Sequence, residues 1–91
     1  MKYLIQGGES AERIALLLRF TKISSPRIIA ALNDHFVTGY QETRAAIRNG
    51  VKESNLTRAI NTLEDTAHNA EMLKELDWVK FGYKFESSEV A

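Results

Sequence analysis

The chain has 91 residues, no cysteine, and 12 basic residues against 12 acidic ones, so its formal net charge is zero. This length provides one small domain and excludes a large enzyme with a deep cleft, and the lack of cysteine excludes disulfides and thiolate zinc sites. Apolar runs such as Ile28–Leu32, with five residues, are far shorter than the roughly 20 residues of a membrane span. Because its start shows no signal-peptide pattern, we expect the protein to be cytoplasmic.

The zero net charge hides two halves of opposite sign. Residues 1–63 contain nine Lys or Arg and five Asp or Glu, a net charge of +4, whereas residues 64–91 contain three and seven, a net charge of −4. A basic half joined to an acidic half indicates that the basic half meets a polyanion. The alternative is that both halves are simply solvated faces.

The first predicted helix follows a short flexible segment. Gly7 and Gly8 end a flexible N-terminus of residues 1–8. Ser10 can cap a helix that runs to about Thr21, with apolar residues at the i, i+3 and i+4 spacing of one helical face.

The next two helices have strong signals at their ends. Ser25 followed by Pro26 is a serine cap with proline at the first helical position, and this helix is predicted to run to about Val37. Gly39 is a suitable terminator. A short third helix is predicted over residues 41–49.

A long fourth segment begins at Lys52 or Glu53 and contains no glycine or proline up to Asp77. Its apolar residues recur with a period near 3.5, which is typical of an amphipathic helix. The segment forms either one helix of about 25 residues or two helices separated at Asp65 and Thr66, which can cap a new helix.

The chain ends in an aromatic tail, residues 78–91. Phe81, Tyr83 and Phe85 alternate with other residues, which is a strand-like pattern. Because a lone strand is unstable, we expect the tail to pack its aromatic rings on the domain or on another chain, with oligomerisation as one role.

A segment in the middle of the chain carries the features of a helix-turn-helix. Ala46 is the small residue that lets the second helix cross closely, Gly50 tolerates positive φ in the turn, and Val51 follows it as an apolar plug. Leu56 is the inward apolar residue of the second helix. Asn49 departs from the pattern, because such motifs usually bury a large apolar side chain at that position.

The predicted fold is therefore all-α, a small helix-turn-helix bundle over residues 9–77 that includes a long or extended C-terminal helix. The outward face of the motif carries cations and short polar side chains, the groups that a helix presents to phosphates and base edges of double-stranded DNA. Solubilising charge and helix capping are the alternative roles of these side chains. The candidate DNA-binding residues are Arg44, Arg48, Lys52, Ser54, Asn55, Thr57, Arg58 and Asn61.

The chain resembles the Pap/Fae-type regulators of fimbrial adhesin biosynthesis over about residues 8–65. The positions that carry the resemblance are Ser24, Ser25, Arg27, Ile28, Asp34, Phe36, Val37, Gly39, Val51, Leu56, Ile60 and Leu63. The tail after Thr66 has no counterpart in this resemblance. A second, weaker similarity is to small plasmid-encoded repressors with a long helix after the helix-turn-helix.

The resemblance implies an all-helical, oligomeric transcription regulator at the bacterial nucleoid. It implies binding to repeated AT-rich sites near a fimbrial or plasmid-borne operon, and it admits reading of the minor groove as well as the major groove. The alternative function is a helical protein-interaction module that acts as an adaptor or as an antagonist of another regulator.

Neither an enzyme nor a metal site is predicted. His35 and His68 lie far apart in the sequence and lack ligand spacing. The acidic residues of the C-terminal half are typical of a solvated helix face rather than of an acid–base pair. We therefore expect no catalytic residue, no cofactor, no metal and no small-molecule substrate.

The apolar stripe of the fourth segment continues beyond the point where a short reading helix ends. The simplest account is a homodimer or a higher homo-oligomer in which this helix and the tail pack across a symmetry axis. The alternative is a tail that folds back onto its own domain. The candidate oligomerisation residues are Leu63, Ala67, Ala70, Leu73, Leu76, Trp78 and Phe81.

Overall fold

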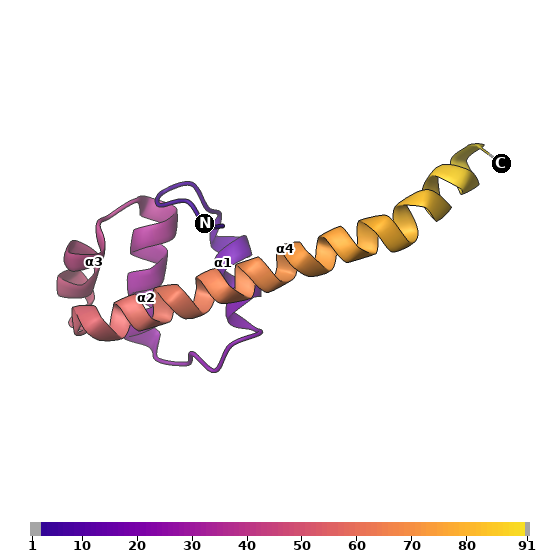
Figure 1. Ribbon diagram of the computed structural model, residues 1–91. Helices are drawn as coiled ribbons and strands as arrows, with labels where there is room; N and C mark the ends of the chain where they lie inside the picture. Colours follow the sequence, from indigo (N-terminus) through magenta and orange to yellow (C-terminus); the bar gives the residue numbers. More distant parts are fainter. Residues whose placement is uncertain (1–2, 91) are drawn as a thin grey trace.

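The computed structural model describes the backbone of residues 3–90 and the side chains of residues 3–77. Within residues 3–90 all regular structure is helical, which confirms the all-α prediction. The elements are α1 (Ala11–Leu18), α2 (Pro26–Asn33), the π-helical turn η1 (Asp34–Thr38), α3 (Glu42–Asn49) and α4 (Glu53–Val90). Three short helices form a bundle with the first half of α4, and the second half of α4 projects from it (Figure 1).

The serine caps at the starts of α1 and α2 form as the sequence predicts. The hydroxyl of Ser10 accepts a hydrogen bond from the N–H of Arg13 at 3.0 Å, and Ser25 accepts one from Ile28 at 3.4 Å. The end of α1 differs from the prediction, because the helix stops three residues before Thr21. The N–H groups of residues 19–21 bond to carbonyls three residues back, so the last turn tightens and the α-helix ends there.

Helix α2 is shorter than predicted because the chain widens into η1. The N–H groups of Gly39 and Tyr40 both donate to the carbonyl of Asp34 at 2.9 Å, and Gly39 has φ of 100°. This turn keeps both His35 and Phe36 in the core. Nδ1 of His35 lies 2.7 Å from the carbonyl oxygen of Tyr40, a hydrogen bond that requires the proton on Nδ1.

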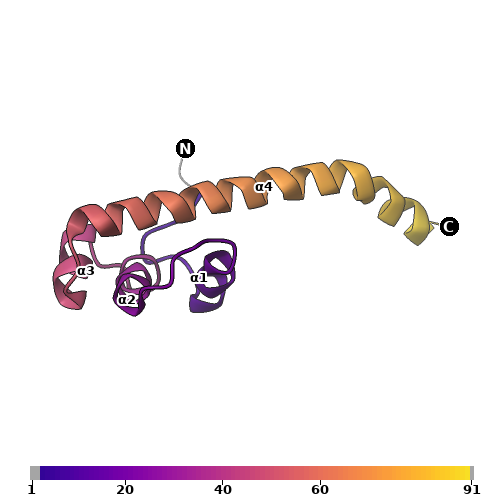
Figure 2. The ribbon, with the colours of Figure 1, turned by 90° about the horizontal axis from the view of Figure 1, so that it is seen from below.

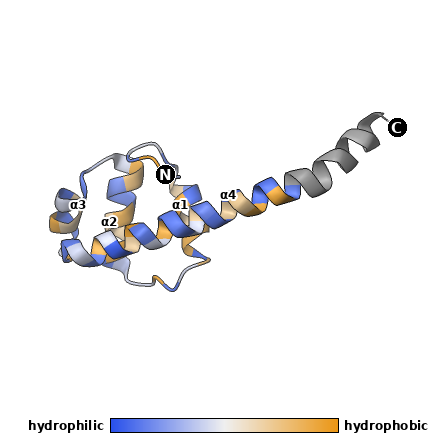
Figure 3. Ribbon diagram, in the orientation of Figure 1, coloured by the Kyte–Doolittle hydropathy of each residue, from blue (hydrophilic) through white to orange (hydrophobic). Residues whose placement is uncertain are grey.

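The hydrophobic core lies between α4 and the other helices. Figure 2 shows α4 as a layer of its own, with α1, α2 and α3 side by side against it. Apolar residues recur along the bundled part of α4 between hydrophilic ones (Figure 3). The largest fully buried side chains are Ile14, Leu32, Phe36, Leu56 and Leu63.

Helix α4 is continuous from Glu53 to Val90, with 38 residues and a length of about 57 Å. A break at Asp65 is therefore the wrong alternative, and the strand-like interpretation of residues 81–85 is also wrong. A helix satisfies its backbone hydrogen bonds locally, whereas a lone strand leaves them without partners. The tail runs away from the bundle rather than back onto it (Figure 1). No helix in the described part of the chain is long and apolar enough to cross a membrane.

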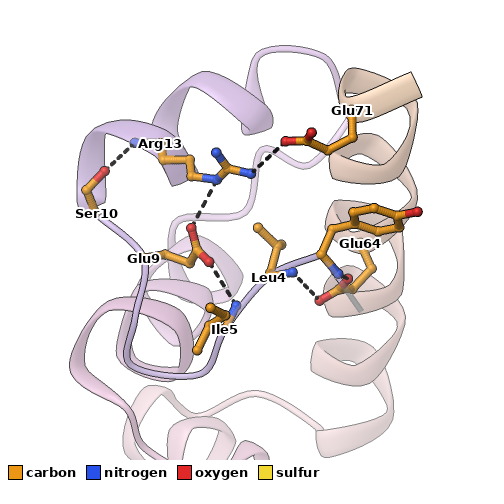
Figure 4. A network of polar contacts seen from close by, with 8 residues as sticks. Leu4, Ile5, Glu9, Ser10, Arg13, Glu64 and Glu71 are labelled. Atoms are coloured by element: carbon orange, nitrogen blue, oxygen red, sulfur yellow. Dashed lines mark hydrogen bonds and ion pairs between the residues drawn. The ribbon is translucent and has the colours of Figure 1, made fainter. Parts of the chain in front are cut away.

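The N-terminal segment, expected to be flexible, is bound to α4 and η1 over residues 3–8. The N–H groups of Tyr3 and Leu4 donate to the carboxylate of Glu64 at 2.8 and 3.3 Å, and Leu4 is buried (Figure 4). The N–H of Gly7 donates to the carbonyl of His35 at 3.2 Å. These contacts join residues far apart in the sequence, so the Gly7-Gly8 pair alone did not reveal them.

A second set of polar contacts joins the start of α1 to α4. Arg13 lies between two carboxylates, 3.0 Å from Glu9 and 4.0 Å from Glu71 (Figure 4). Glu9 also accepts a hydrogen bond from the N–H of Ile5 at 2.8 Å. The N-terminus, α1 and α4 are thereby linked along the acidic flank of α4.

Candidate nucleic-acid interface

Helices α3 and α4 are joined by a turn of three residues, 50–52. Gly50 has φ of 66° and caps α3, and the N–H of Val51 donates to the carbonyl of Ala46 at 3.0 Å. Ala46 and Leu56 are buried on either side of the turn. The residues that the sequence assigns to the turn and its core contacts therefore lie where they are expected.

The polar residue at position 49 has a structural explanation. Its Nδ2 donates to the carboxylate of Asp34 at 2.8 Å and to the carbonyl of Ala45 at 2.8 Å. Asp34 also forms an ion pair with Arg48 at 3.3 Å. Asn49 thus joins the end of α3 to the start of η1 by hydrogen bonds, where an apolar side chain would do so by packing.

The cations of α3 lie on an exposed face beside an aromatic ring. The guanidinium groups of Arg44 and Arg48 lie 5.5 and 4.3 Å from the centre of the Tyr40 ring, within the range of cation–π attraction. Ile47, between them in the sequence, is 75% exposed. The ring lies beside both cations, and the Asp34 carboxylate holds Arg48 in addition.

The first turns of α4 present a polar outward face. Ser54, Arg58 and Asn61 follow one another at i, i+4 and i+7, so they line one side of the helix, and all three are exposed. Asp65 lies on the same side one turn further and is also exposed. The uncharged and basic part of this face therefore ends before Asp65. Lys52 is exposed in the turn before α4.

Two of the predicted DNA-binding residues lie on opposite flanks of α4 rather than on its outward face. The hydroxyl of Thr57 donates to the carboxylate of Glu42 on α3 at 2.9 Å, beside a matching contact from Thr43 to Glu53 at 3.0 Å. Asn55 lies on the other flank, where it lines a groove that faces the loop before α2. All eight predicted residues are exposed on α3, the turn or α4.

The fold brings two further cations, Lys22 and Arg27, near the α3–α4 turn and the first turns of α4. The residue spacing in the sequence did not assign them to this interface. Lys22 lines the same groove as Arg58. Nη1 of Arg27 lies beside the α3–α4 turn, 3.8 Å from where a Cβ on Gly50 would stand. Both precede α2 or lie in its first turn, so only tertiary packing places them near α4.

The family is decided by comparison with known sequences. The sequence profile of the PapB family, described as adhesin biosynthesis transcription regulatory protein, matches residues 1–76. The chain belongs to the PapB family. No curated protein and no solved structure matches the chain. The match confirms the resemblance found in the sequence and extends it in both directions, to the N-terminal segment and to α4 as far as Leu76.

This PapB-family protein is accordingly a transcription regulator of adhesin biosynthesis. In the described part of the chain, no group of three or more His, Cys, Asp or Glu side chains is placed to hold a metal ion.

The oligomerisation residues predicted for this PapB-family protein divide into three groups. Leu63 and Ala67 are fully buried in the core of the single chain. Leu73 and Leu76 are 60% and 65% exposed, and Ala70 is exposed with them. Trp78 and Phe81 lie outside the residues whose side chains are described. The first half of the apolar stripe therefore lies in the core between α4 and the other helices, and its second half is exposed.

Proposed function

We propose that this PapB-family protein regulates transcription by binding double-stranded DNA through α3, the turn and the first turns of α4. Ser54, Arg58 and Asn61 are the groups that face the bases and the nearby backbone. Arg44 and Arg48 supply phosphate contacts from α3. The observation that supports this function best is the exposed face formed by Ser54, Arg58 and Asn61, which carries no acidic residue before Asp65, together with the exposed cations of α3.

The distribution of charge along α4 supports a contact with DNA that is confined to the first turns of this helix. Asp65 continues the outward face beyond Asn61, and its carboxylate is repelled by phosphates. The following residues of α4 up to Asp77 include further acids and a single lysine, Lys74. In the proposed complex the second half of α4 therefore points away from the duplex.

We further propose that the protein acts as a homo-oligomer on repeated AT-rich sites at the bacterial nucleoid. The resemblance to the Pap/Fae-type regulators supports the sites, and the exposed Leu73 and Leu76 support the association. Two-fold repeats in DNA are matched by two-fold symmetry in the protein. The operon is proposed to be fimbrial or plasmid-borne.

Gel-shift titration across salt concentration tests the proposed DNA binding. The wild-type chain is titrated with an AT-rich repeat duplex and with a random duplex between about 50 and 200 mM salt. Each phosphate contact contributes roughly −0.9 to the slope of log affinity against log salt. Arg48→Ala and Lys52→Ala are expected to weaken binding to both duplexes alike and to flatten that slope. An affinity that ignores salt contradicts the proposal.

Substitutions on the outward face of α4 test sequence reading. Ser54→Ala and Arg58→Ala are expected to cost about 1–3 kcal/mol on the preferred site and little on random DNA. An equal loss of affinity for both duplexes would mean that these residues contact the DNA backbone and not the bases. If a minor-groove drug competes with the protein and base methylation in the major groove leaves the affinity unchanged, the protein reads the minor groove.

The alternative function, a helical protein-interaction module, draws support from the exposed apolar side chains Phe20, Leu73 and Leu76. Failure of the wild-type chain to bind either duplex at low salt favours this alternative over DNA binding.

A further inference from the structure

A groove of about 490 Å³ runs along one flank of α4, between this helix and the loop before α2. Its walls carry two cations and four small polar side chains, and the rest of its lining is apolar. The polar residues that line it are Lys22, Ser24, Ser25, Asn55, Arg58 and Thr62.

The chemistry of this groove suits an anion. None of the described residues that line it is acidic, although acidic residues make up about half of the charged residues of the chain. Ser25 is the N-cap of α2, so the positive end of that helix dipole also faces the groove. Hydroxyl and amide groups beside Lys and Arg are the usual partners of phosphate oxygens in protein–DNA contacts.

The groove lies on the flank of α4 opposite to α3. Consecutive residues of an α-helix are about 100° apart, so Asn55 and Thr57 face opposite ways around α4. Thr57 contacts Glu42 of α3, whereas Asn55 lines the groove. The flank of α4 toward α3 is thus bordered by Glu42 and Thr43, and the opposite flank by Lys22. Arg44 and Arg48 lie elsewhere on α3, beside Tyr40.

We propose that this groove binds a backbone phosphate of the DNA strand opposite to the one held by α3. The inference rests on the DNA binding proposed above. Lys22, Ser24 and Asn55 would hold this phosphate, and the contact would position α4 between the two DNA strands. In this arrangement Asn55 contacts the backbone and reads no base. Arg58, at the rim of the groove, lies between the outward face and the bound phosphate.

The first test measures the salt dependence of binding for two variants of equal charge change. Lys22→Ala removes the groove cation, and Lys74→Ala removes an exposed cation on the distal half of α4. Loss of one phosphate contact makes the slope of log affinity against log salt shallower by about 0.9. When salt rises from about 50 to 200 mM, the affinity of Lys22→Ala is therefore expected to fall by a factor about threefold to fourfold smaller than the factor for wild type. Lys74→Ala is expected to keep the wild-type slope.

A second variant places a negative charge in the groove without harming the helix. Asn55→Asp is nearly isosteric, and residue 55 is the third residue of α4, where a carboxylate favours the helix dipole. We expect Asn55→Asp to weaken binding at least tenfold on preferred and random duplexes alike, with an unchanged melting temperature. A loss of affinity confined to the preferred duplex would contradict phosphate binding in the groove and would mean that Asn55 contacts a base.

The partner phosphate is found by replacing single phosphates of the duplex with neutral methylphosphonates. Each replaced duplex is titrated with wild type and with Lys22→Ala. The replacement that weakens binding by wild type but not by Lys22→Ala identifies the phosphate in the groove. If every replacement weakens the two proteins equally, and Lys22→Ala keeps the slope that Arg48→Ala lowers, the groove holds no phosphate while DNA binding through α3 stands. If the wild-type chain binds no duplex, the proposed function fails together with the groove.

Discussion

At the scale of single residues, the contacts of Asp34 explain how Arg48 is held at the end of α3. Its carboxylate accepts hydrogen bonds from Asn49 at 2.8 Å and Arg48 at 3.3 Å, while its carbonyl closes η1. Arg48 lies over the Tyr40 ring at the same time. One acidic residue thus fixes the end of α3, the turn before it and a proposed phosphate contact.

The Asn49–Asp34 hydrogen bond is expected to contribute measurably to stability. Asn49→Ala should lower the free energy of unfolding by about 1–2 kcal/mol, because a half-buried hydrogen bond to a charged acceptor is lost. Urea denaturation measures the change. A double-mutant cycle with Asp34→Ala should give a coupling of about 1 kcal/mol.

Asn61→Ala is the matched control for this substitution. It removes the same amide from an exposed position on α4, and it should change stability by less than about 0.5 kcal/mol. Equal stabilities of Asn49→Ala and Asn61→Ala would mean that the hydrogen bond to Asp34 contributes nothing.

At the scale of elements, the turn between α3 and α4 sets the placement of the two helices that form the proposed DNA interface. It depends on Gly50, whose φ of 66° is the left-handed conformation that side chains with a Cβ disfavour. A Cβ there meets no atom closer than Nη1 of Arg27 at 3.8 Å. Any cost of substitution at Gly50 therefore comes from the backbone conformation and not from a clash.

Two substitutions at Gly50 separate these causes. Gly50→Ala should lower the free energy of unfolding by about 1–2 kcal/mol, and Gly50→Asn should cost clearly less, because asparagine tolerates the left-handed region. Thermal or urea unfolding of both variants gives the comparison. A larger loss for the bulkier asparagine would indicate a steric cause and contradict the space found around Gly50.

Signals close together in the sequence predicted the elements well. The caps at Ser10 and Ser25 and the glycines at 39 and 50 act within a few residues of their own position, so the starts of α1 and α2 and the α3–α4 turn were predictable. The exposed positions of the eight candidate residues followed from the same helical periods.

Contacts between distant residues were not predictable in this way. Glu64 binds the N–H of Tyr3, 61 positions away, and no pattern in the flexible-looking N-terminus indicates it. The apolar stripe of α4 gave the correct face, but periodicity does not say which partner covers each part. Leu63 therefore lies in the core of one chain, and Leu73 on the surface.

At the scale of the whole molecule, α4 belongs to two environments. Among the residues of α4 whose side chains are described, Ala67 is the last buried one, and exposed apolar side chains follow it, among them Met72, Leu73 and Leu76. An isolated chain leaves these side chains in water, so burial against a second copy is favourable. The core of the described residues ends at Ala67, so we expect association and folding to be separable in this chain.

The last prediction uses this separation to test the oligomer. The intact chain is expected to sediment as a dimer or larger species at tens of micromolar. A chain truncated after Asp77, and a full chain with Leu73→Gln and Leu76→Gln, are expected to sediment as folded monomers with weaker binding to repeated sites. Leu63→Ala is the contrasting variant, because it opens a cavity in the core and should lower stability by about 2–5 kcal/mol. A monomeric intact chain would remove the oligomer, and unfolding of the truncated chain would show that the core depends on residues beyond Asp77.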